Sequence, residues 1–226
     1  MQLINSQVMR QGLTESIERI IDNVSTLECI KPYILCGGTA LAMQLGHRLS
    51  EDLDFMAWRT SRTEKPEVDW PVISEEIEQK IGPVENMDLL GFDQVVFLVK
   101  GVKISFYIPD KYMPEMVPVS YLGNIRIAPV TAIMTMKLEV MLRRMKFRDY
   151  YDVYCMVREG ADIKEGIESA IKYSQFNLKK KNVVSMLLSG RFYPDSNFSQ
   201  MNPKYDITEP QMRDYLLRKI LDSGMI

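Results

Sequence analysis

Residues 35–55 read LCGGTALAMQLGHRLSEDLDF, and this stretch decides the fold. It starts within a short apolar run, Tyr33–Cys36, which is followed by the pair Gly37-Gly38. Thr39 then opens a run of good helix formers, where a hydroxyl side chain can cap the first turn. Acidic and apolar residues alternate over residues 51–55, which is the period of a strand with one polar face. The stretch therefore predicts a strand, a glycine turn, a helix and a second strand.

The same stretch joins two kinds of groups that phosphate chemistry needs. A turn at Gly37 and Gly38 lets the backbone approach a phosphate and aims free helix N–H groups at it, and Thr39 can add a hydroxyl. Asp52 and Asp54 alternate with apolar residues, so both carboxylates face the same side of the predicted strand. Mg²⁺ usually binds through one or two carboxylates and substrate phosphates. The arrangement is typical of metal-dependent phosphoryl and nucleotidyl transfer.

The composition excludes several classes of protein. The chain has 226 residues, with 28 Lys or Arg against 30 Asp or Glu, so it is no polycation built around nucleic acid. Its single histidine, His47, excludes zinc sites made from several histidines. The three cysteines lack CxxC spacing, which suits a reducing compartment. No apolar run approaches the ~20 residues of a bilayer span. We expect a cytoplasmic protein without a membrane segment.

The remaining pattern predicts two regions. In the first, apolar residues at three- and four-residue steps predict a helix over 13–27, and the other expected elements are a helix at 72–81, a hairpin at 94–99 and 102–108, and a strand at 124–128. After Pro129 helices are expected at 131–147, 150–158, 163–173, 178–189 and 209–222. The fold class we predict is α/β (α+β), a mixed sheet with helices over residues 1–129. A helical domain over residues 130–226 is expected to complete the cleft.

A second group of charged residues lies in the helical region. If residues 131–148 form one helix, Lys137, Arg144 and Arg148 lie within about 40° of one another on its surface. Such a stripe would suit nucleotide phosphates, with the lysine as a point charge and the arginines as bidentate donors. The alternative is a solvated helix face whose ion-pair partners are Asp149 and Asp152.

These residues make the sequence resemble a known family. Residues 35–55 are similar to motif I of the DNA polymerase β-like nucleotidyltransferases, in particular to the AbiEii/AbiGii toxin branch. The similarity is closest at Arg48, Ser50, Asp52, Leu53, Asp54 and Phe55. A later segment of that branch resembles Lys137, Arg144, Lys146, Arg148, Asp149 and Asp152. The resemblance therefore touches both regions of the chain.

The resemblance implies a nucleotidyltransferase that uses Mg²⁺ or Mn²⁺. It implies metal binding by Asp52 and Asp54, and catalytic roles for these two residues, Lys137 and Asp149. The implied nucleotide-binding residues are Gly37, Gly38, Thr39, Arg48, Ser50, Arg144 and Arg148. The donor would be an NTP, and the acceptor an RNA such as tRNA, or a protein. The chain would be the toxin of a toxin–antitoxin or phage-defence pair, with an antitoxin protein as partner.

One position departs from the pattern of this superfamily. A third carboxylate on the neighbouring strand completes the metal site in many of its members, and here the equivalent position holds Ser105. Asp93, Asp110 or the Asp149/Asp152 pair would have to supply a third acid from elsewhere. Two alternatives therefore stay open. One is a catalytically weak nucleotide- or RNA-binding module with the same fold, and the other is a small-molecule nucleotidyltransferase of the aminoglycoside type.

Overall fold

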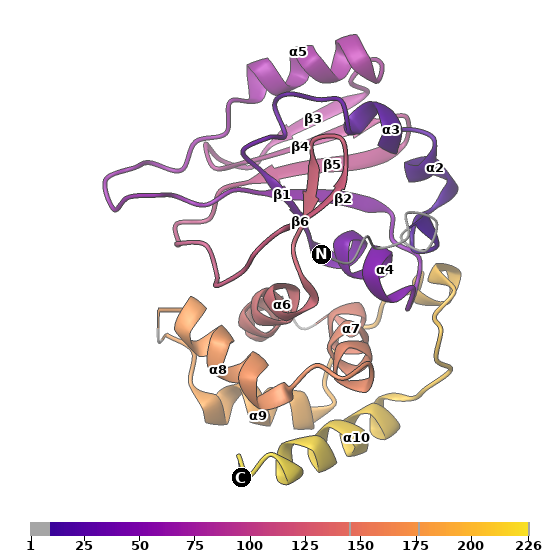
Figure 1. Ribbon diagram of the computed structural model, residues 1–226. Helices are drawn as coiled ribbons and strands as arrows, with labels where there is room; N and C mark the ends of the chain where they lie inside the picture. The colour runs from indigo at the N-terminus through magenta and orange to yellow at the C-terminus, as the bar shows by residue number, and fades with distance from the viewer. Residues whose placement is uncertain (1–9, 145, 176, 226) are drawn as a thin grey trace. The chain divides into compact units, whose positions relative to one another are not determined.

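The computed structural model describes residues 10–144, 146–175 and 177–225 (Figure 1). The chain divides into two compact units between Pro129 and Val130, where the sequence pattern changes from mixed to helical. Within the described residues, no helix has the length and apolar character needed to cross a bilayer.

The N-terminal unit is built on a mixed sheet. Its seven strands, counted over the described residues, lie in the order β3-β4-β5-β2-β1-β7-β6. Their bounds are Ile34–Cys36 (β1), Asp52–Met56 (β2), Asn86–Leu89 (β3), Gln94–Val99 (β4), Val102–Tyr107 (β5), Val119–Leu122 (β6) and Ile125–Ile127 (β7). Strand β2 runs parallel to β5 and antiparallel to β1, so both its edges are paired. The α/β prediction is confirmed; the short strands β3 and β6 were not expected.

The alternation in β2 separates a core face from a polar face. Leu53 and Phe55 are buried, whereas Asp52 and Asp54 on the other face are partly accessible. The Phe55 ring stacks on Phe106 of β5, with ring centroids 5.4 Å apart. Burial of large side chains on one face therefore orients β2, because a shift of one residue would exchange the two faces.

Four helices of this unit lie within the described residues: Glu15–Glu18 (α2), Ile21–Val24 (α3), Gly37–Leu45 (α4) and Trp70–Lys80 (α5). Figure 1 shows α4 and α5 on opposite sides of the sheet. The single helix expected over 13–27 is wrong in its continuity, because the Ile20 N–H bonds the Ile17 carbonyl in a tighter turn between α2 and α3. Its apolar face is confirmed: Ile17, Ile20, Ile21, Val24 and Leu27 are all fully buried.

The C-terminal unit is helical, as predicted. Its helices are Val130–Arg144 (α6), Phe147–Arg158 (α7), Ile163–Tyr173 (α8), Lys180–Ser189 (α9) and Glu209–Asp222 (α10), with a short 3₁₀ turn at Phe198–Met201 (η1). The continuous helix expected over 131–148 is wrong. Helix α6 ends at Arg144, and Lys146 is extended and precedes α7.

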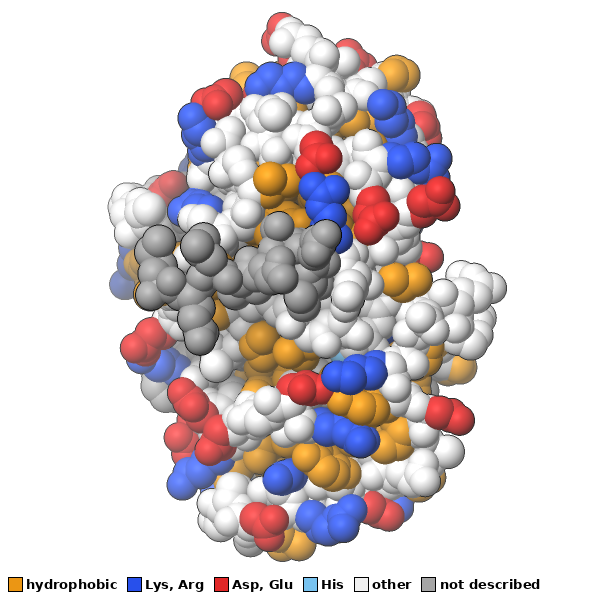
Figure 2. Space-filling view, turned by 45° about the vertical axis from the view of Figure 1, so that its right-hand side comes forward, with side chains coloured by type: hydrophobic (Ala, Val, Ile, Leu, Met, Phe, Trp, Pro, Cys, Tyr) orange, Lys and Arg blue, Asp and Glu red, His pale blue; other side chains and the backbone are white. Residues whose placement is uncertain are grey.

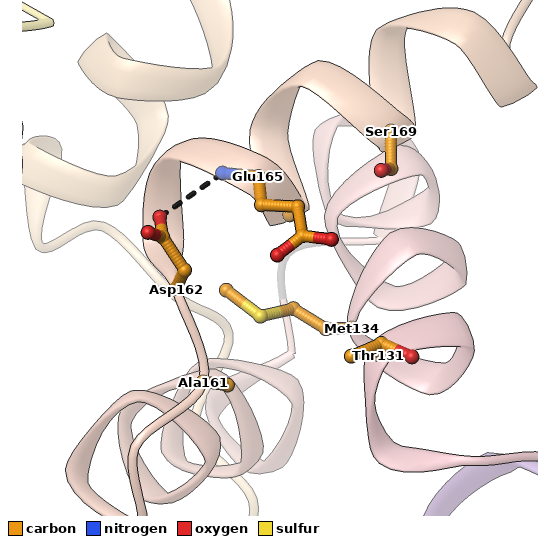
Figure 3. A pocket seen from close by; sticks show the side chains of 7 residues that line it. Thr131, Met134, Ala161, Asp162, Glu165 and Ser169 are labelled. Atoms are coloured by element: carbon orange, nitrogen blue, oxygen red, sulfur yellow. Dashed lines mark hydrogen bonds between the residues drawn. The ribbon is translucent and has the colours of Figure 1, made fainter.

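Helices α6 and α8 approach closely at a glycine. Asp162 precedes α8 and accepts hydrogen bonds from the N–H groups of Lys164 and Glu165, the second of which is drawn in Figure 3. The Met134 side chain of α6 reaches the first turn of α8 beside them (Figure 3). A Cβ at Gly166 would lie 2.7 Å from Met134 Cε, so a larger residue would require the Met134 side chain to move. Local capping and a small residue thus set how these two helices pack.

Glu76 links α5 to the segment after α3 by hydrogen bonds. Its two carboxylate oxygens accept hydrogen bonds from the N–H groups of Glu28 and Cys29, each at 2.7 Å, and the Lys80 ammonium lies 2.7 Å from Oε1. Burial alone would raise the pKa of Glu76, but these donors outweigh it and lower the pKa to about 2. Native contacts therefore favour the ionised form.

We expect Glu76→Gln to lower the free energy of unfolding at pH 7 by about 1–2 kcal/mol, since charge-assisted hydrogen bonds become neutral ones. The wild-type contribution is complete above the ordinary carboxyl pKa of 4.5 and is lost as pH falls toward the folded value of about 2. Urea unfolding from pH 7 to pH 2.5 measures both effects. Glu78→Gln, at an exposed position of the same helix, is the control and should change little. Equal losses for the two variants would contradict the assignment.

Candidate functional site

The site predicted from the sequence lies on the polar face of β2. Asp54 is paired in register with Ser105 of β5 and with Cys36 of β1. Ser105 Oγ donates a hydrogen bond of 2.7 Å to Asp54 Oδ1. Burial, and secondly the nearby Asp54 carboxylate, raise the pKa of the Cys36 thiol well above its usual range, so the thiol stays neutral. The Ser105 hydroxyl therefore orients Oδ1 of Asp54.

The other oxygen of Asp54 faces the glycine turn. Gly37 has a φ of +68°, and a Cβ there would lie 2.5 Å from Asp54 Oδ2. A side chain at this position would occupy the space of the carboxylate oxygen. Because α4 begins at Gly37, the positive end of the helix dipole lies beside this carboxylate. The turn, the helix start and Asp54 form one local unit.

Gly38 allows an arginine to pack under the turn. A Cβ at Gly38 would lie 2.5 Å from Arg48 Nη2 and 3.2 Å from Ser50 Oγ. Arg48 is 4% exposed and donates from Nη1 to the Leu49 carbonyl at 2.9 Å. Arg48 and Ser50 thus lie below the glycines and support the turn from the inside.

Thr39 joins α4 to β2. It is 1% exposed, and its hydroxyl contacts both the Asp52 carbonyl oxygen and Ser50 Oγ, the latter at 2.8 Å. The sequence predicted this hydroxyl as a phosphate ligand, but the structure places it within the protein. Thr39, Arg48 and Ser50 hold the glycine turn against the strand that carries the two aspartates.

Strand β2 carries two carboxylates on this face, Asp52 and Asp54, and the strand register puts Asp88 of the edge strand β3 on the same face, three strands from β2. Ser105 stands beside Asp54, as the sequence indicated, and Asp110, one of the possible substitutes, is ion-paired with Arg59. No group of three or more His, Cys, Asp or Glu side chains that could hold a metal occurs in residues 10–144, 146–175 and 177–225. A metal here would take its other ligands from substrate phosphates and water, as Mg²⁺ commonly does.

Lysine 103 is a residue that the sequence interpretation missed. It is paired in register with Asp52, next to the Asp54–Ser105 pair, and its side chain is exposed. Register partners on parallel strands share a face of the sheet, so Lys103 lies on the face of the carboxylates. The alternation of apolar and polar residues over 102–107 was the signal that could have found it.

The cationic residues of the C-terminal unit form a buried cluster. Lys137 is 6% exposed, and its Nζ lies 2.8 Å from Asp149 Oδ1 and 2.7 Å from Asp152 Oδ2. Arg144 donates to both oxygens of Asp149, at 2.9 Å and 2.8 Å. Both aspartates are fully buried. Asp149 and Asp152 are therefore the ion-pair partners that the sequence offered, but Lys137 and both aspartates are buried, so the solvated helix face of that alternative is wrong.

The sequence suggested Asp149 as an additional acid, and in the structure its carboxylate is bound by two cations. Burial raises the pKa of its carboxyl, but the charges and hydrogen bonds of Lys137 and Arg144 outweigh burial and lower the pKa below its ordinary value. Its two oxygens already accept hydrogen bonds from these cations. These contacts favour a role in orienting Lys137.

Arg148 does not share a helical stripe with Lys137 and Arg144, so that expectation is wrong. The break after α6 places Arg148 on α7, where its Nε contacts Asp195 Oδ2 in an ion pair. The angular argument failed because it assumed one continuous helix.

Comparison with known protein families finds one whose model matches most of the chain. The family model described as "Nucleotidyl transferase AbiEii toxin, Type IV TA system" matches residues 19–191. An uncharacterized protein of Aquifex aeolicus (strain VF5) is 27% identical over 218 residues, which cover 94% of this chain and 96% of that protein.

Solved structures share the fold at low identity. MenT4, a nucleotidyltransferase toxin from Mycobacterium tuberculosis H37Rv, is 16% identical with a TM-score of 0.55, over 93% of this chain and 88% of that one. JHP933 from Helicobacter pylori is 17% identical with a TM-score of 0.50, over 98% and 97% of the two chains. A further H. pylori protein is 20% identical with a TM-score of 0.52, over 97% and 98%.

We expect Asp149→Asn to lower the free energy of unfolding by about 3–5 kcal/mol, because it leaves the buried Lys137 ammonium with less compensating charge. The wild-type stabilisation is complete above the ordinary carboxyl pKa of 3.8 and is lost as pH falls below it, since the folded pKa is lowered. Urea unfolding at pH 7 and pH 3.5 measures both. Asp214→Asn, which removes an exposed ion pair with Arg213, should cost less than about 1 kcal/mol. A loss of that small size for Asp149→Asn would show that the cluster contributes little.

Proposed function

The chain belongs to the AbiEii family of nucleotidyltransferase toxins, and we propose that it transfers a nucleotide from an NTP to an acceptor, which is RNA such as tRNA, or a protein. An antitoxin protein is the expected partner, and the cytoplasm, where NTPs are available, is the expected compartment. The observation that carries the proposal is the position of the glycine turn against Asp54, on the strand that also carries Asp52.

Asp52 and Asp54 are the proposed ligands of Mg²⁺ or Mn²⁺. The space that Gly37 leaves for Asp54 Oδ2 and the hydroxyl contact of Ser105 to Oδ1 hold one carboxylate in a defined position, so the donor set suits a hard divalent ion. When bound, such an ion neutralises the charge that develops on a transferring phosphoryl group. Two carboxylates suffice for this arrangement when substrate phosphates complete the ligands.

The glycine turn is the proposed phosphate-binding element. The N–H groups at the start of α4, around Gly37 and Gly38, carry the positive end of the helix dipole and suit the outer phosphates of an NTP. Thr39, Arg48 and Ser50 act as positioning residues in this proposal, because their polar atoms hold the turn from below. Lys103, beside Asp52, is a further candidate for contact with phosphate.

The other proposed contacts of the nucleotide phosphates are Lys137, Arg144 and Arg148 of the C-terminal unit. Each is ion-paired with an aspartate, so they offer donors of fixed orientation and no net positive charge. Asp149 orients Lys137 and Arg144, since it accepts hydrogen bonds from both. Preorganised donors stabilise a transition state without the cost of reorganisation.

One observation favours a second candidate, a nucleotide-binding module without turnover. Ser105 stands at the position beside Asp54 where many members of the superfamily carry a third carboxylate. A hydroxyl can orient Asp54, but at neutral pH it lacks the proton affinity of a general base. The two candidates predict the same nucleotide binding and opposite results for transfer.

We expect the wild-type chain, supplied with each α-labelled NTP, Mg²⁺ and total cellular RNA, to incorporate label into RNA or protein. Asp54→Asn should reduce incorporation at least about 100-fold, because a charged ligand becomes neutral at the reacting phosphate. Gel electrophoresis of RNA and protein fractions measures the product. Asp88→Asn on strand β3 is the matched control and should incorporate label at the wild-type rate.

Saturable NTP binding without incorporation would contradict the transferase and support the binding module. Label found only in small molecules, after addition of hydroxylated acceptors such as aminoglycosides, would contradict an RNA or protein acceptor.

A glycine comparison tests the geometry at Asp54. Gly37→Ala and Gly46→Ala both place alanine at positive φ, +68° and +56°, and the backbone conformation alone should cost each variant about 1 kcal/mol of stability. Only the Cβ at residue 37 meets Asp54, whereas nothing lies within 4 Å of the one at residue 46. We therefore expect Gly37→Ala to weaken Mg²⁺-dependent NTP binding at least tenfold and Gly46→Ala to leave it unchanged. Isothermal titration measures the affinity, and equal affinities would contradict a site at this turn.

A further inference from the structure

The C-terminal unit contains an open hollow that the proposed reaction does not use. It has a volume of about 420 Å³ and lies between the end of α7, the segment 204–207 and α10. The side chains that give it its chemical character are Tyr154, Arg158, Lys204, Tyr205, Tyr215 and Arg218. On the face drawn in Figure 2, Lys and Arg side chains lie beside side chains of the hydrophobic class, which includes Tyr, over the C-terminal helices.

The aromatic part of the hollow is built around Tyr154. This ring is 1% exposed and makes edge contacts with Tyr215 and Tyr205, at centroid distances of 5.3 Å and 6.1 Å. Tyr205 and Tyr215 are themselves half-buried, so part of each ring remains accessible. Three tyrosines from two helices and a connecting segment therefore form the wall of one small space.

Arg158 is held over this wall. Its guanidinium carbon lies 3.9 Å from the centre of the Tyr205 ring, and Nη1 donates a hydrogen bond to the Tyr154 hydroxyl oxygen. A guanidinium stacked on a ring keeps its remaining N–H donors in a fixed plane. The orientation of Arg158 is thus set before any ligand binds.

The charges at the hollow are incompletely balanced. Lys204 pairs with Glu159 at 2.7 Å, and Asp206 also lines the space. No carboxylate among the described residues lies within 4.0 Å of the guanidinium nitrogens of Arg158 or Arg218. In a chain whose net charge is −2, two such arginines facing one tyrosine-lined space are a local positive site.

We propose that this hollow binds one nucleotide unit of a single-stranded nucleic acid, with Arg158 and Arg218 on phosphate and the accessible parts of Tyr205 and Tyr215 against a base, while the buried Tyr154 ring supports them. The inference deepens the proposed function, because it assigns a nucleic-acid strand as the acceptor class and gives the residues that hold it. A guanidinium matches two phosphate oxygens in its fork geometry. Base contact with aromatic side chains is the usual sequence-tolerant mode for single strands.

The size and lining of the hollow support a nucleotide over an acidic peptide. A volume near 420 Å³ admits a nucleotide-sized group. Carboxylates of a peptide would satisfy the arginines but would leave the tyrosine rings without a planar partner. A ligand with both phosphate and a flat ring uses both parts of the site.

Binding of a labelled 12-nucleotide single-stranded RNA to the full chain, followed by fluorescence anisotropy from 50 to 200 mM salt, tests the proposal. We expect Arg158→Gln/Arg218→Gln to raise the Kd at least tenfold and to reduce the slope of log K against log salt by about 1.4, since each lost phosphate contact accounts for about 0.7. If the double variant loses helical signal, Arg218→Gln alone replaces it in the test. This variant changes an exposed side chain and should raise the Kd at least threefold.

The matched control removes two charges elsewhere in the same unit. Lys164→Gln/Arg191→Gln changes two exposed residues outside the hollow and should alter the Kd less than twofold. Equal weakening by the two double variants would show unspecific attraction and overturn the proposal. Binding of an oligoglutamate peptide as tight as that of RNA would also overturn it, in favour of a protein partner.

Failure of RNA binding at the hollow can be distinguished from failure of the proposed transferase activity. Asp54→Asn should bind the RNA with the wild-type Kd, because Asp54 is not among the residues that line the hollow. The arginine double variant should in turn bind NTP with wild-type affinity. Wild-type chain that binds NTP and transfers label to protein, but does not bind RNA, would overturn the hollow as a nucleic-acid site and leave the transferase intact.

Discussion

The structure of the N-terminal unit depends on one carboxylate in the middle of a sheet. Asp54 lies on a strand paired on both edges, where a charged group needs hydrogen bonds or solvent to replace lost hydration. Ser105 Oγ supplies one hydrogen bond, and the missing side chain of Gly37 leaves room for the other oxygen beside the start of α4. The glycine turn, the serine and the aspartate are therefore parts of one arrangement, and none of the three could be exchanged without affecting the others.

The residues between the glycine turn and the two aspartates are also part of this arrangement. Arg48, Ser50 and Thr39 are buried, and their polar atoms bond to backbone and to one another beneath the turn. They connect α4 to β2 and so couple the glycines to the aspartates. Such a base would hold the proposed nucleotide site in one geometry before substrate binds, which is the condition for efficient electrostatic stabilisation.

In the C-terminal unit, buried charged side chains likewise hold one another in position. Lys137 lies between Asp149 and Asp152, and Arg144 neutralises the second negative charge locally. A cluster of two cations and two anions can remain ionised in the interior because each charge has a partner at hydrogen-bond distance. The arginines of the α7/α10 hollow contrast with this cluster. The Arg158 guanidinium lies over the Tyr205 ring, and Arg218 Nε donates to the Asp214 carbonyl oxygen.

The sequence by itself determined the order of elements around the glycine turn, the apolar faces and the shared face of Asp52 and Asp54, because these follow from periods of two or three to four residues along a short stretch. The resemblance to the nucleotidyltransferases also placed Ser105 beside Asp54, which the strand register confirms. Only the tertiary structure decided that the side chains of Thr39 and Arg48 are buried and that α6 ends before Arg148. It also decided that Lys204, Arg218 and Tyr154 line one hollow. These outcomes depend on contacts between residues far apart in the chain, and no local period encodes which distant side chain will compete for a hydroxyl or a charge.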